Sequence, residues 1–288
     1  MHLALLAVQV LFGLWPVAGA AVLRQVSPAS MIGVRTILAT PILFLMARRT
    51  GASLPSRRDL VALAGLAFLG VAANQLLYAE GLLRAGPINA AVLMVTIPAL
   101  TLAVAMLTGR ERPASTKIGG VILALVGAAI ILRVERLDLS SETVTGNLLI
   151  LGNATCYACY LVFARPVVGR VGATAAIAWV FFFGSIEALP LTAGPMLATP
   201  WSSLPPWVFA MFVFIVLGPS VGAYGLNAYA LRSVDASIVA VYVTLQPLIS
   251  AAASWWLLQE RITGRVLAGG AVIVAGVFLA SRSSADQK

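Results

Sequence analysis

The stretch VTIPALTLAVAMLTGRER (residues 95–112) recurs later in the chain as VTLQPLISAAASWWLLQER (residues 243–261). Both copies begin with Val-Thr, have a proline soon afterwards, continue through an apolar run and end in Glu-Arg. Two matching glycines follow each copy, Gly120 and Gly127 in the first and Gly269 and Gly276 in the second. The order of these matches predicts that the chain consists of two related halves.

The composition indicates which solvent surrounds both halves. Of the 288 residues, 60% are hydrophobic and only 10% are charged, whereas soluble globular proteins are roughly 25% charged. The mean hydropathy is +0.98. Apolar runs of about twenty residues alternate with short polar spacers, and this is the length that crosses the hydrocarbon core as an α-helix. We therefore predict an all-α membrane protein.

Ten transmembrane helices fit the pattern, with turn residues such as Ser27-Pro28, Gly86-Pro87 and Gly109 between them. The predicted spans are residues 3–23, 29–47, 60–83, 88–108, 118–133, 146–165, 172–193, 206–228, 236–258 and 266–281. The first has no preceding Lys or Arg and is interpreted as a retained helix and not a signal peptide.

Each half contains five spans, and an odd number places the second half upside down relative to the first. The prediction is an inverted repeat, with residues 1–137 as the first unit and residues 146–281 as the second. In transporters built in this way the substrate site lies between the units, near the midplane of the bilayer. We expect a central cavity there.

Orientation follows from the Lys and Arg residues of the spacers, which favour the cytoplasmic side. With both termini inside, the inner residues are Arg48, Arg49, Arg57, Arg58, Arg110, Arg112, Lys117, Arg165, Arg170, Arg232, Arg282 and Lys288. The outer residues are Arg24, Arg84, Arg133, Arg136, Arg261 and Arg265. This imbalance predicts a multi-pass protein of the cytoplasmic (inner) membrane with both termini inside.

Several functional classes are disfavoured. The net charge of +9 comes from spacer residues and not from a basic face, so we expect no nucleic-acid partner. Cys156 and Cys159 have no further metal ligands near them in the sequence, and we expect neither a metal nor another cofactor. The chain has no Gly-rich loop for ATP. An intramembrane enzyme is also unlikely, because the only histidine is His2.

The paired motif resembles the EamA-type drug/metabolite transporters over nearly the whole chain. It consists of a mid-helix proline, a Glu-Arg pair and a glycine-rich next helix: Pro98, Glu111-Arg112, Gly119-Gly120 and Gly127, then Pro247, Glu260-Arg261, Gly269-Gly270 and Gly276. Within that superfamily the chain resembles aromatic amino acid exporters of the YddG type. The resemblance implies ten helices around a cavity, alternating access and amino-acid efflux.

Candidate site residues are polar or aromatic side chains within spans, where exposure to lipid is costly. Tyr242 and Gln246 share one helix face with Ser250 and Ser254, and Pro247 interrupts that helix. The predicted substrate-binding residues are Trp15, Arg35, Asn74, Tyr78, Met94, Tyr157, Tyr224, Asn227, Tyr242 and Gln246. Aromatic walls suit planar substrates and ammonium groups. The alternative is that such residues hydrogen-bond helices together.

Charged residues within spans are expected mainly to be structural. Arg35 is expected to pair with Glu80 or Glu187, with binding of a substrate carboxylate as the alternative. Glu111 is expected to cap or link helices. The motif glycines predict close packing of the fifth and tenth helices.

The resulting functional hypothesis is a transporter that exports amino acids, aromatic or otherwise neutral, and related metabolites. The alternatives are an exporter of other small organic solutes or drugs, and a passive channel. The expected partners are a small-molecule substrate and the lipid bilayer, and the sequence does not define an oligomer. No carboxylate or histidine is clearly placed for a proton relay, so weak coupling or facilitated transport is expected.

Overall fold

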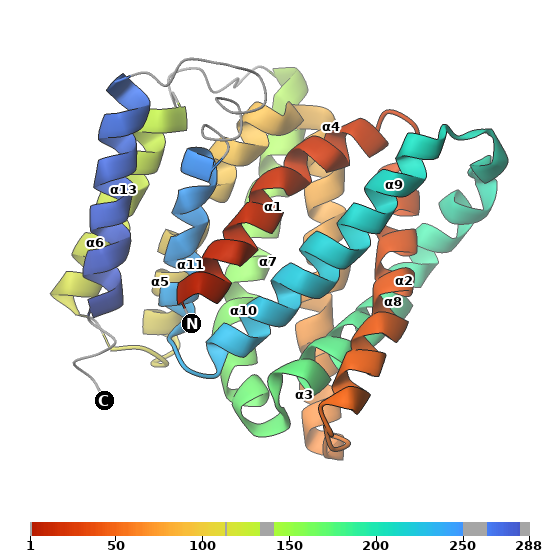
Figure 1. The fold of residues 1–288 in the computed structure, drawn as a ribbon, viewed down its shortest axis with the longest axis horizontal. Helices are drawn as coiled ribbons and strands as arrows, with labels where there is room; N and C mark the ends of the chain where they lie inside the picture. Colours follow the sequence, from red (N-terminus) through yellow and green to blue (C-terminus); the bar gives the residue numbers. More distant parts are fainter. Residues whose placement is uncertain (1, 113, 133–140, 250–263, 283–288) are drawn as a thin grey trace.

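The computed structural model describes residues 2–112, 114–132, 141–249 and 264–282, and all regular structure in these ranges is helical. In the first half, helices follow one another along the chain as α1 (His2–Val22), α2 (Pro28–Arg49), α3 (Arg57–Ala67), η1 (Phe68–Ala72), α4 (Ala73–Met94), α5 (Ile97–Leu107) and α6 (Ser115–Leu132). Figure 1 shows these helices packed side by side as one bundle with the later ones.

Further helices follow in the second half of the chain. It contains α7 (Ser141–Val171), α8 (Ala173–Ala198), η3 (Trp201–Ser203), α9 (Pro206–Ile215), η4 (Val216–Ala223), α10 (Tyr224–Leu231), α11 (Ala236–Val241), η5 (Tyr242–Leu245) and α13 (Gly264–Arg282). Across the described residues, seven helical stretches are long and apolar enough to cross a membrane, and three shorter apolar helices accompany them.

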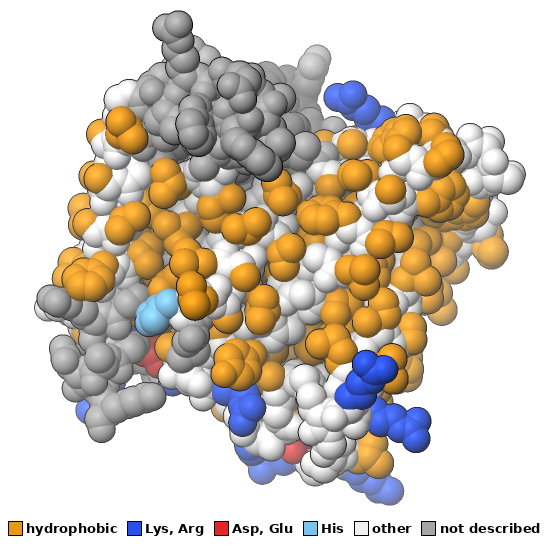
Figure 2. All heavy atoms as spheres, in the orientation of Figure 1, with side chains coloured by type: hydrophobic (Ala, Val, Ile, Leu, Met, Phe, Trp, Pro, Cys, Tyr) orange, Lys and Arg blue, Asp and Glu red, His pale blue; other side chains and the backbone are white. Residues whose placement is uncertain are grey.

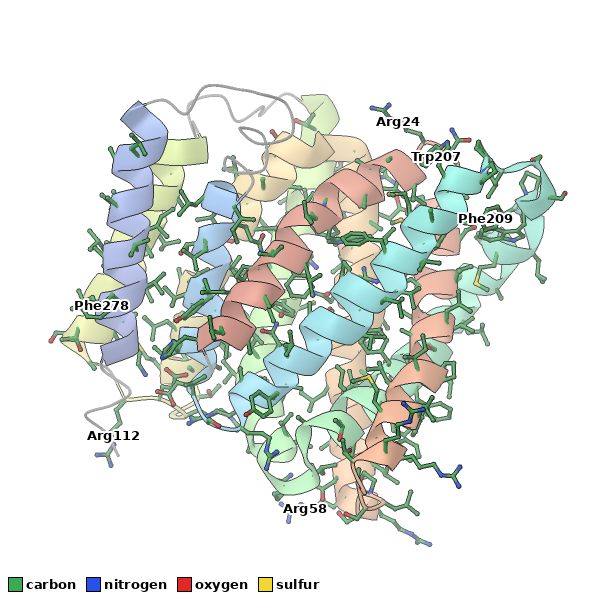
Figure 3. The ribbon with its side chains drawn as sticks, viewed as in Figure 1. Arg24, Arg58, Arg112, Trp207, Phe209 and Phe278 are labelled. Carbon is green, nitrogen blue, oxygen red and sulfur yellow. The ribbon has the colours of Figure 1, made fainter. Side chains whose placement is uncertain are left out.

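The outer surface is apolar, as a bilayer requires. Figure 2 shows hydrophobic side chains over the middle of the visible face, with Lys and Arg gathered towards its ends. Trp207, Phe209 and Phe278 point outward in Figure 3 and are 43%, 44% and 59% exposed. Large side chains of this type in contact with water would be unfavourable, so this exposure indicates a lipid-facing surface.

Turn chemistry separates the helices where the sequence predicts it. Gly51, Gly86 and Gly109 all have a positive φ, which glycine adopts without steric strain. Gly86 lies within α4 and breaks it into two helical parts. The Ser27 side chain accepts a hydrogen bond from the Ser30 amide and caps α2. The predicted boundary at Arg165 is wrong: α7 continues through Pro166 to the residue before Gly172, whose φ is 89°. The helix contains Pro166 within it, whereas the positive φ of Gly172 is incompatible with continued helix.

The predicted close packing of the fifth and tenth spans is confirmed for α6 and α13. A Cβ atom at Gly120 would collide with the Ala280 amide nitrogen, and one at Gly276 with the Ala124 amide nitrogen. Only glycine permits backbones this close.

A buried charge network joins the two halves at one end of the bundle. The Lys117 ammonium lies 2.9 Å from Glu111 Oε2 and 2.6 Å from Asp235 Oδ2, and Arg165 Nη1 lies 2.8 Å from Asp235 Oδ1. Glu111 also accepts hydrogen bonds from the amide and hydroxyl of Ser237. Glu111 thus links helices as expected, whereas its repeat partner Glu260 lies outside the described residues.

Candidate functional site

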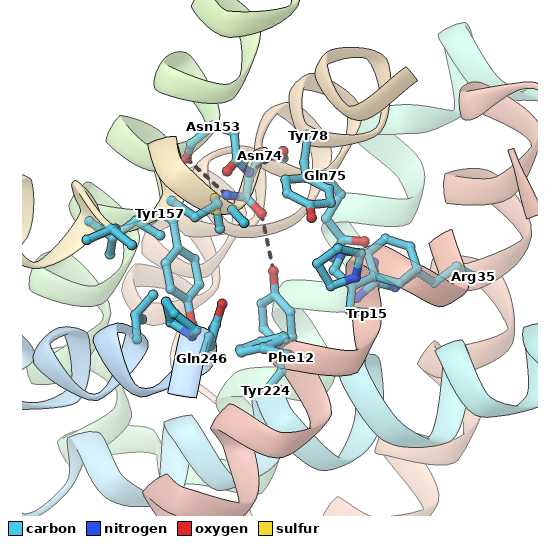
Figure 4. A pocket seen from close by; sticks show the side chains of 18 residues that line it. Phe12, Trp15, Arg35, Asn74, Gln75, Tyr78, Asn153, Tyr157, Tyr224 and Gln246 are labelled. Atoms are coloured by element: carbon cyan, nitrogen blue, oxygen red, sulfur yellow. Dashed lines mark hydrogen bonds between the residues drawn. The ribbon is translucent and has the colours of Figure 1, made fainter. Parts of the chain in front are cut away.

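A central cavity opens between the helices of the two halves. Its volume is about 160 Å³, which is below the roughly 300–1,000 Å³ typical of small-molecule sites. Side chains from α1, α2, α4, α5, α7, α10 and the α11–η5 segment line it (Figure 4). The lining thus combines residues from both halves of the chain.

Interruptions in four helices shape the cavity wall. A π-helical segment, η1, directly precedes Asn74 and Gln75, and a second, η4, directly precedes Tyr224. A turn at Val95–Thr96 separates α4 from α5, and the 3-10 segment η5 precedes Gln246. These interruptions turn polar side chains inward, and irregular backbone within a membrane is tolerated where it faces protein or a watery cavity.

Hydroxyl groups satisfy several backbone carbonyls near these interruptions. The Ser220 hydroxyl donates to the Ile215 carbonyl at 2.8 Å, five residues back. The Thr96 hydroxyl donates to Leu93 at 2.7 Å, and the Thr244 hydroxyl donates to Val241 at 2.7 Å. The freed carbonyls are therefore partly paired within the protein.

Aromatic rings form two walls of the cavity. Trp15 and Tyr78 stack with their centroids 6.0 Å apart. Phe12 meets Tyr157 edge to face at 6.4 Å and Tyr224 at 5.8 Å. Such surfaces bind planar apolar groups, and their faces attract cations.

Arg35 is the cation of the cavity wall. Only 2% of the residue is exposed, and its guanidinium carbon lies 4.4 Å from the centroid of the Trp15 ring. Arg35 Nε donates a hydrogen bond of 2.6 Å to Ser220 Oγ. No carboxylate of the described residues lies within ion-pair distance of Arg35. Its charge is therefore available to an anionic ligand group.

The expected ion pair of Arg35 with Glu80 or Glu187 is thus wrong. Glu80 instead pairs with Arg84, one turn along the same helix, at 3.1 Å. Glu187 Oε2 has no hydrogen-bond partner in the described part of the chain. Depth along a helix can be estimated from sequence, but the direction in which the side chain points depends on packing. Because neither expected carboxylate pairs with Arg35, the alternative role of this residue, binding of a substrate carboxylate, is favoured.

Amide side chains complete the cavity wall. Asn74 and Asn153 exchange hydrogen bonds, with each Nδ2 donating to the other residue's backbone carbonyl at 3.2 and 2.7 Å. The Tyr224 hydroxyl is placed to donate to the Gly70 carbonyl at 2.8 Å and to Asn74 Oδ1 at 3.3 Å. Gln246 Nε2 donates to Gln9 Oε1 at 2.9 Å. These bonds connect α4 with α7 and α10, and α1 with the helical residues that follow η5.

The structure brings eight of the ten predicted residues to this cavity. They are Trp15, Arg35, Asn74, Tyr78, Met94, Tyr157, Tyr224 and Gln246.

The other two predicted residues lie behind or beside the wall. Asn227 donates a 2.6 Å hydrogen bond to the Tyr157 hydroxyl, and Tyr242 stacks on His2. The 3-10 winding of η5 rotates Tyr242 away from the face of Gln246. The prediction that Tyr242 and Gln246 share one helix face is therefore wrong. Ser250 and Ser254 lie outside the described residues.

Three polar or aromatic lining residues were missing from the predicted site: Phe12, Gln75 and Asn153. Phe12 lies one turn before Trp15 and Pro16, and Asn153 lies one turn before Tyr157. Gln75 lies next to Asn74, so an allowance for a wider helix face would have included it.

The chain also resembles known proteins. The EamA-like transporter family matches residues 1–133 and 144–282. A protein of Archaeoglobus fulgidus described as an uncharacterized transporter is 29% identical, over 89% of this chain and 89% of its own length. A Salmonella typhimurium protein described as a probable amino-acid metabolite efflux pump is 25% identical, over 96% of this chain and 93% of its own.

A solved crystal structure shares the fold. It superimposes with a TM-score of 0.77 at 19% identity, and the match covers 98% of this chain and 97% of the other. At this identity the likeness concerns the fold alone.

Proposed function

Because the chain belongs to the EamA-like transporter family and is a multi-pass membrane transporter, we propose that it exports amino acids by alternating access. The substrates in this proposal are aromatic or otherwise neutral amino acids and closely related metabolites. The cavity is the substrate site, the transporter lies in the cytoplasmic membrane, and both termini are inside.

Contacts between helices support two inverted five-helix units, residues 1–137 and 146–281. Across the bundle α2 packs on α8, α5 on α11 and α6 on α13, while α1 packs on η4 and α4 packs on α7. A two-fold axis that exchanges each span of one unit with the corresponding span of the other leaves the α2–α8, α5–α11 and α6–α13 contacts unchanged. The same axis exchanges the contact of α1 with η4 for the contact of α7 with α4. Opposed units of this type can rock about a fixed central site.

The helix interruptions add independent support for the repeat. The two π segments begin at Phe68 and Val216, which are 148 residues apart (216 minus 68). The turn at Val95 and the η5 residue Val243 are separated by the same 148 residues. Backbone irregularities at equivalent depths in both units are the usual marker of a transporter site.

The distribution of basic residues supports the orientation. Figure 3 shows Arg58 and Arg112 at one end of the bundle and Arg24 at the other. On the face visible in Figure 2, more Lys and Arg side chains of the described residues lie at the first end than at the other, and such residues favour the cytoplasm.

The single observation that carries the choice of substrate is Arg35. A buried guanidinium with no carboxylate partner among the described residues, set against aromatic walls, suits a small ligand that has a carboxylate and an apolar side chain. A buried unpaired charge is expensive within a membrane and usually functional.

Counterflow in proteoliposomes tests the proposal. Vesicles that contain purified protein and are preloaded with unlabelled L-phenylalanine should accumulate external labelled L-phenylalanine transiently and saturably. Arg35→Gln should remove at least about 90% of this flux, because one charged hydrogen-bonding partner changes affinity by about ten-fold or more. Flux that never saturates and shows no counterflow would indicate a channel. Counterflow of other solutes, but of no amino acid, would reject the substrate class.

Direction needs a separate assay. Cells that produce the protein and are fed a phenylalanine-containing dipeptide should hold less internal phenylalanine than cells that produce Arg35→Gln. Equal internal levels would reject export.

A further inference from the structure

Two amide oxygens in the cavity wall have no hydrogen-bond partner. Gln75 is 3% exposed and Asn153 is 2% exposed, and both line the cavity. Asn153 Oδ1, Gln75 Oε1 and Gln75 Nε2 all lack a partner among the described residues. A buried polar atom left without a partner destabilises a protein, so such atoms commonly have a ligand or an ordered water.

The orientation of the Asn153 amide is fixed by its neighbours. Its Nδ2 donates to the Asn74 backbone carbonyl at 2.7 Å, and this bond leaves Oδ1 as the free atom. An amide oxygen can only accept a hydrogen bond. Asn153 therefore offers the cavity an acceptor, and the Gln75 amide, which has no hydrogen bond of good geometry among the described residues, can offer another.

The acceptors and the cation are at different places on the wall. In the view of Figure 4, Asn153 and Arg35 lie on opposite sides of the cavity, with Gln75 between them. The lining includes one cation and no Asp or Glu among the described residues. The cavity is thus positive at one end and has hydrogen-bond acceptors elsewhere.

We infer that Gln75 and Asn153 bind the ammonium group of an α-amino acid whose carboxylate is held by Arg35. This inference rests on the function proposed above and adds the recognition of the amino group. The Gln75 amide oxygen accepts one hydrogen bond from the ammonium, and Asn153 Oδ1 accepts a second. The side chain of the substrate packs against the Trp15 and Tyr78 rings.

The charge pattern of the wall predicts selectivity for zwitterions. An amine without a carboxylate would place a positive charge near Arg35 with nothing to offset it. A carboxylate without an amine would leave both amide oxygens unpaired. Only a molecule with both groups satisfies Arg35 and the amides together, and a site that hydrogen-bonds a ligand group discriminates strongly against analogues that lack it.

Competition against labelled L-phenylalanine tests this recognition in the reconstituted full-length protein. The competitors are unlabelled L-phenylalanine, 3-phenylpropionate, which lacks the amine, and phenethylamine, which lacks the carboxylate. For the wild type, L-phenylalanine should compete at least about ten-fold better than either analogue, as expected for a hydrogen bond to a charged group.

Gln75→Met is the decisive variant, because neither amide atom of Gln75 has a hydrogen bond of good geometry among the described residues, although Tyr224 lies near it. Its advantage for L-phenylalanine over 3-phenylpropionate should fall by about ten-fold or more, while its thermal stability stays equal to the wild type or rises. Thr192→Val is the matched control. It also removes a buried polar atom without a partner, but Thr192 lies on α8 and does not line the cavity, so the preference should not change.

The possible outcomes separate this inference from the proposed function. If the wild type carries L-phenylalanine but 3-phenylpropionate competes equally well, ammonium recognition is refuted and amino-acid transport stands. If phenethylamine competes equally well, the holding of the carboxylate by Arg35 is refuted. An unchanged preference in Gln75→Met also refutes it and identifies the free amide atoms as sites for water. If the wild type carries no amino acid, both the inference and the proposed function are refuted.

Discussion

Lys117 offers a quantitative test of how the two halves are joined. Lys117→Met keeps most of the apolar stem and removes the ammonium that contacts Glu111 and Asp235. The side chains of Lys117 and Glu111 are only 1% and 3% exposed. Removing one partner from a buried ion pair costs about 3–5 kcal/mol, because the remaining charge stays buried without compensation.

The neighbours of the two carboxylates set the expected value within that range. Glu111 keeps the Ser237 amide at 3.1 Å and the Ser237 hydroxyl at 2.5 Å. Asp235 keeps Arg165 at 2.8 Å. We therefore expect a loss near the lower limit, about 3 kcal/mol in the free energy of unfolding.

Thermal unfolding of the purified protein in detergent provides the measurement. A loss of about 3 kcal/mol corresponds to a fall in Tm of roughly 6–12 °C for a chain of this size class. Adding Glu111→Gln to Lys117→Met should restore part of the loss, because it removes one uncompensated charge. A fall in Tm of less than about 3 °C, or no recovery in the double variant, would show that the network contributes little to stability.

Three further predictions concern packing and the cavity wall. Gly120→Ala should destabilise the protein by about 1–3 kcal/mol, because the added Cβ collides with the Ala280 backbone. Gly119→Ala is the control and should not destabilise it, because the nearest atom to its Cβ lies 3.8 Å away. Equal Tm values for the two variants would contradict the close packing of α6 and α13. Tyr157→Phe should cost about 1–3 kcal/mol because it leaves Asn227 Nδ2 unpaired, and a Tm equal to that of the wild type would refute this role. Gln246→Ala and Tyr78→Ala should each impair transport while membrane insertion stays normal, and wild-type flux in both would exclude them from the site.

Much of the fold can be predicted from sequence because the bilayer imposes simple rules. An apolar run of fixed length becomes a helix, and glycines such as Gly51, Gly86 and Gly109 end the runs. The paired prolines and glycines also indicate where the halves match. These features depend on local sequence and need no knowledge of the packing.

The site is harder to predict because the direction of a side chain depends on the local winding of its helix. The regular four-residue spacing placed Tyr242 with Gln246, but the 3-10 segment η5 separates them. No residue pattern indicates in advance that η1 and η4 are π-helical, although both contain glycine and η4 also contains Pro219. The prediction that Arg35 pairs with Glu80 or Glu187 was wrong for a related reason. Only the assembled bundle shows which side chains of different helices meet.

The unshared charge of Arg35 also has an electrical consequence. A zwitterion adds no net charge to the occupied site, so the loaded cavity remains positive, whereas a simple monoanion would make it neutral. The membrane voltage acts on any charge that changes its electrical depth, by about 2.3 kcal/mol per elementary charge per 100 mV for a full crossing. Any voltage sensitivity of the protein with bound substrate therefore depends on the charge of the Arg35 guanidinium and on the net charge of the substrate.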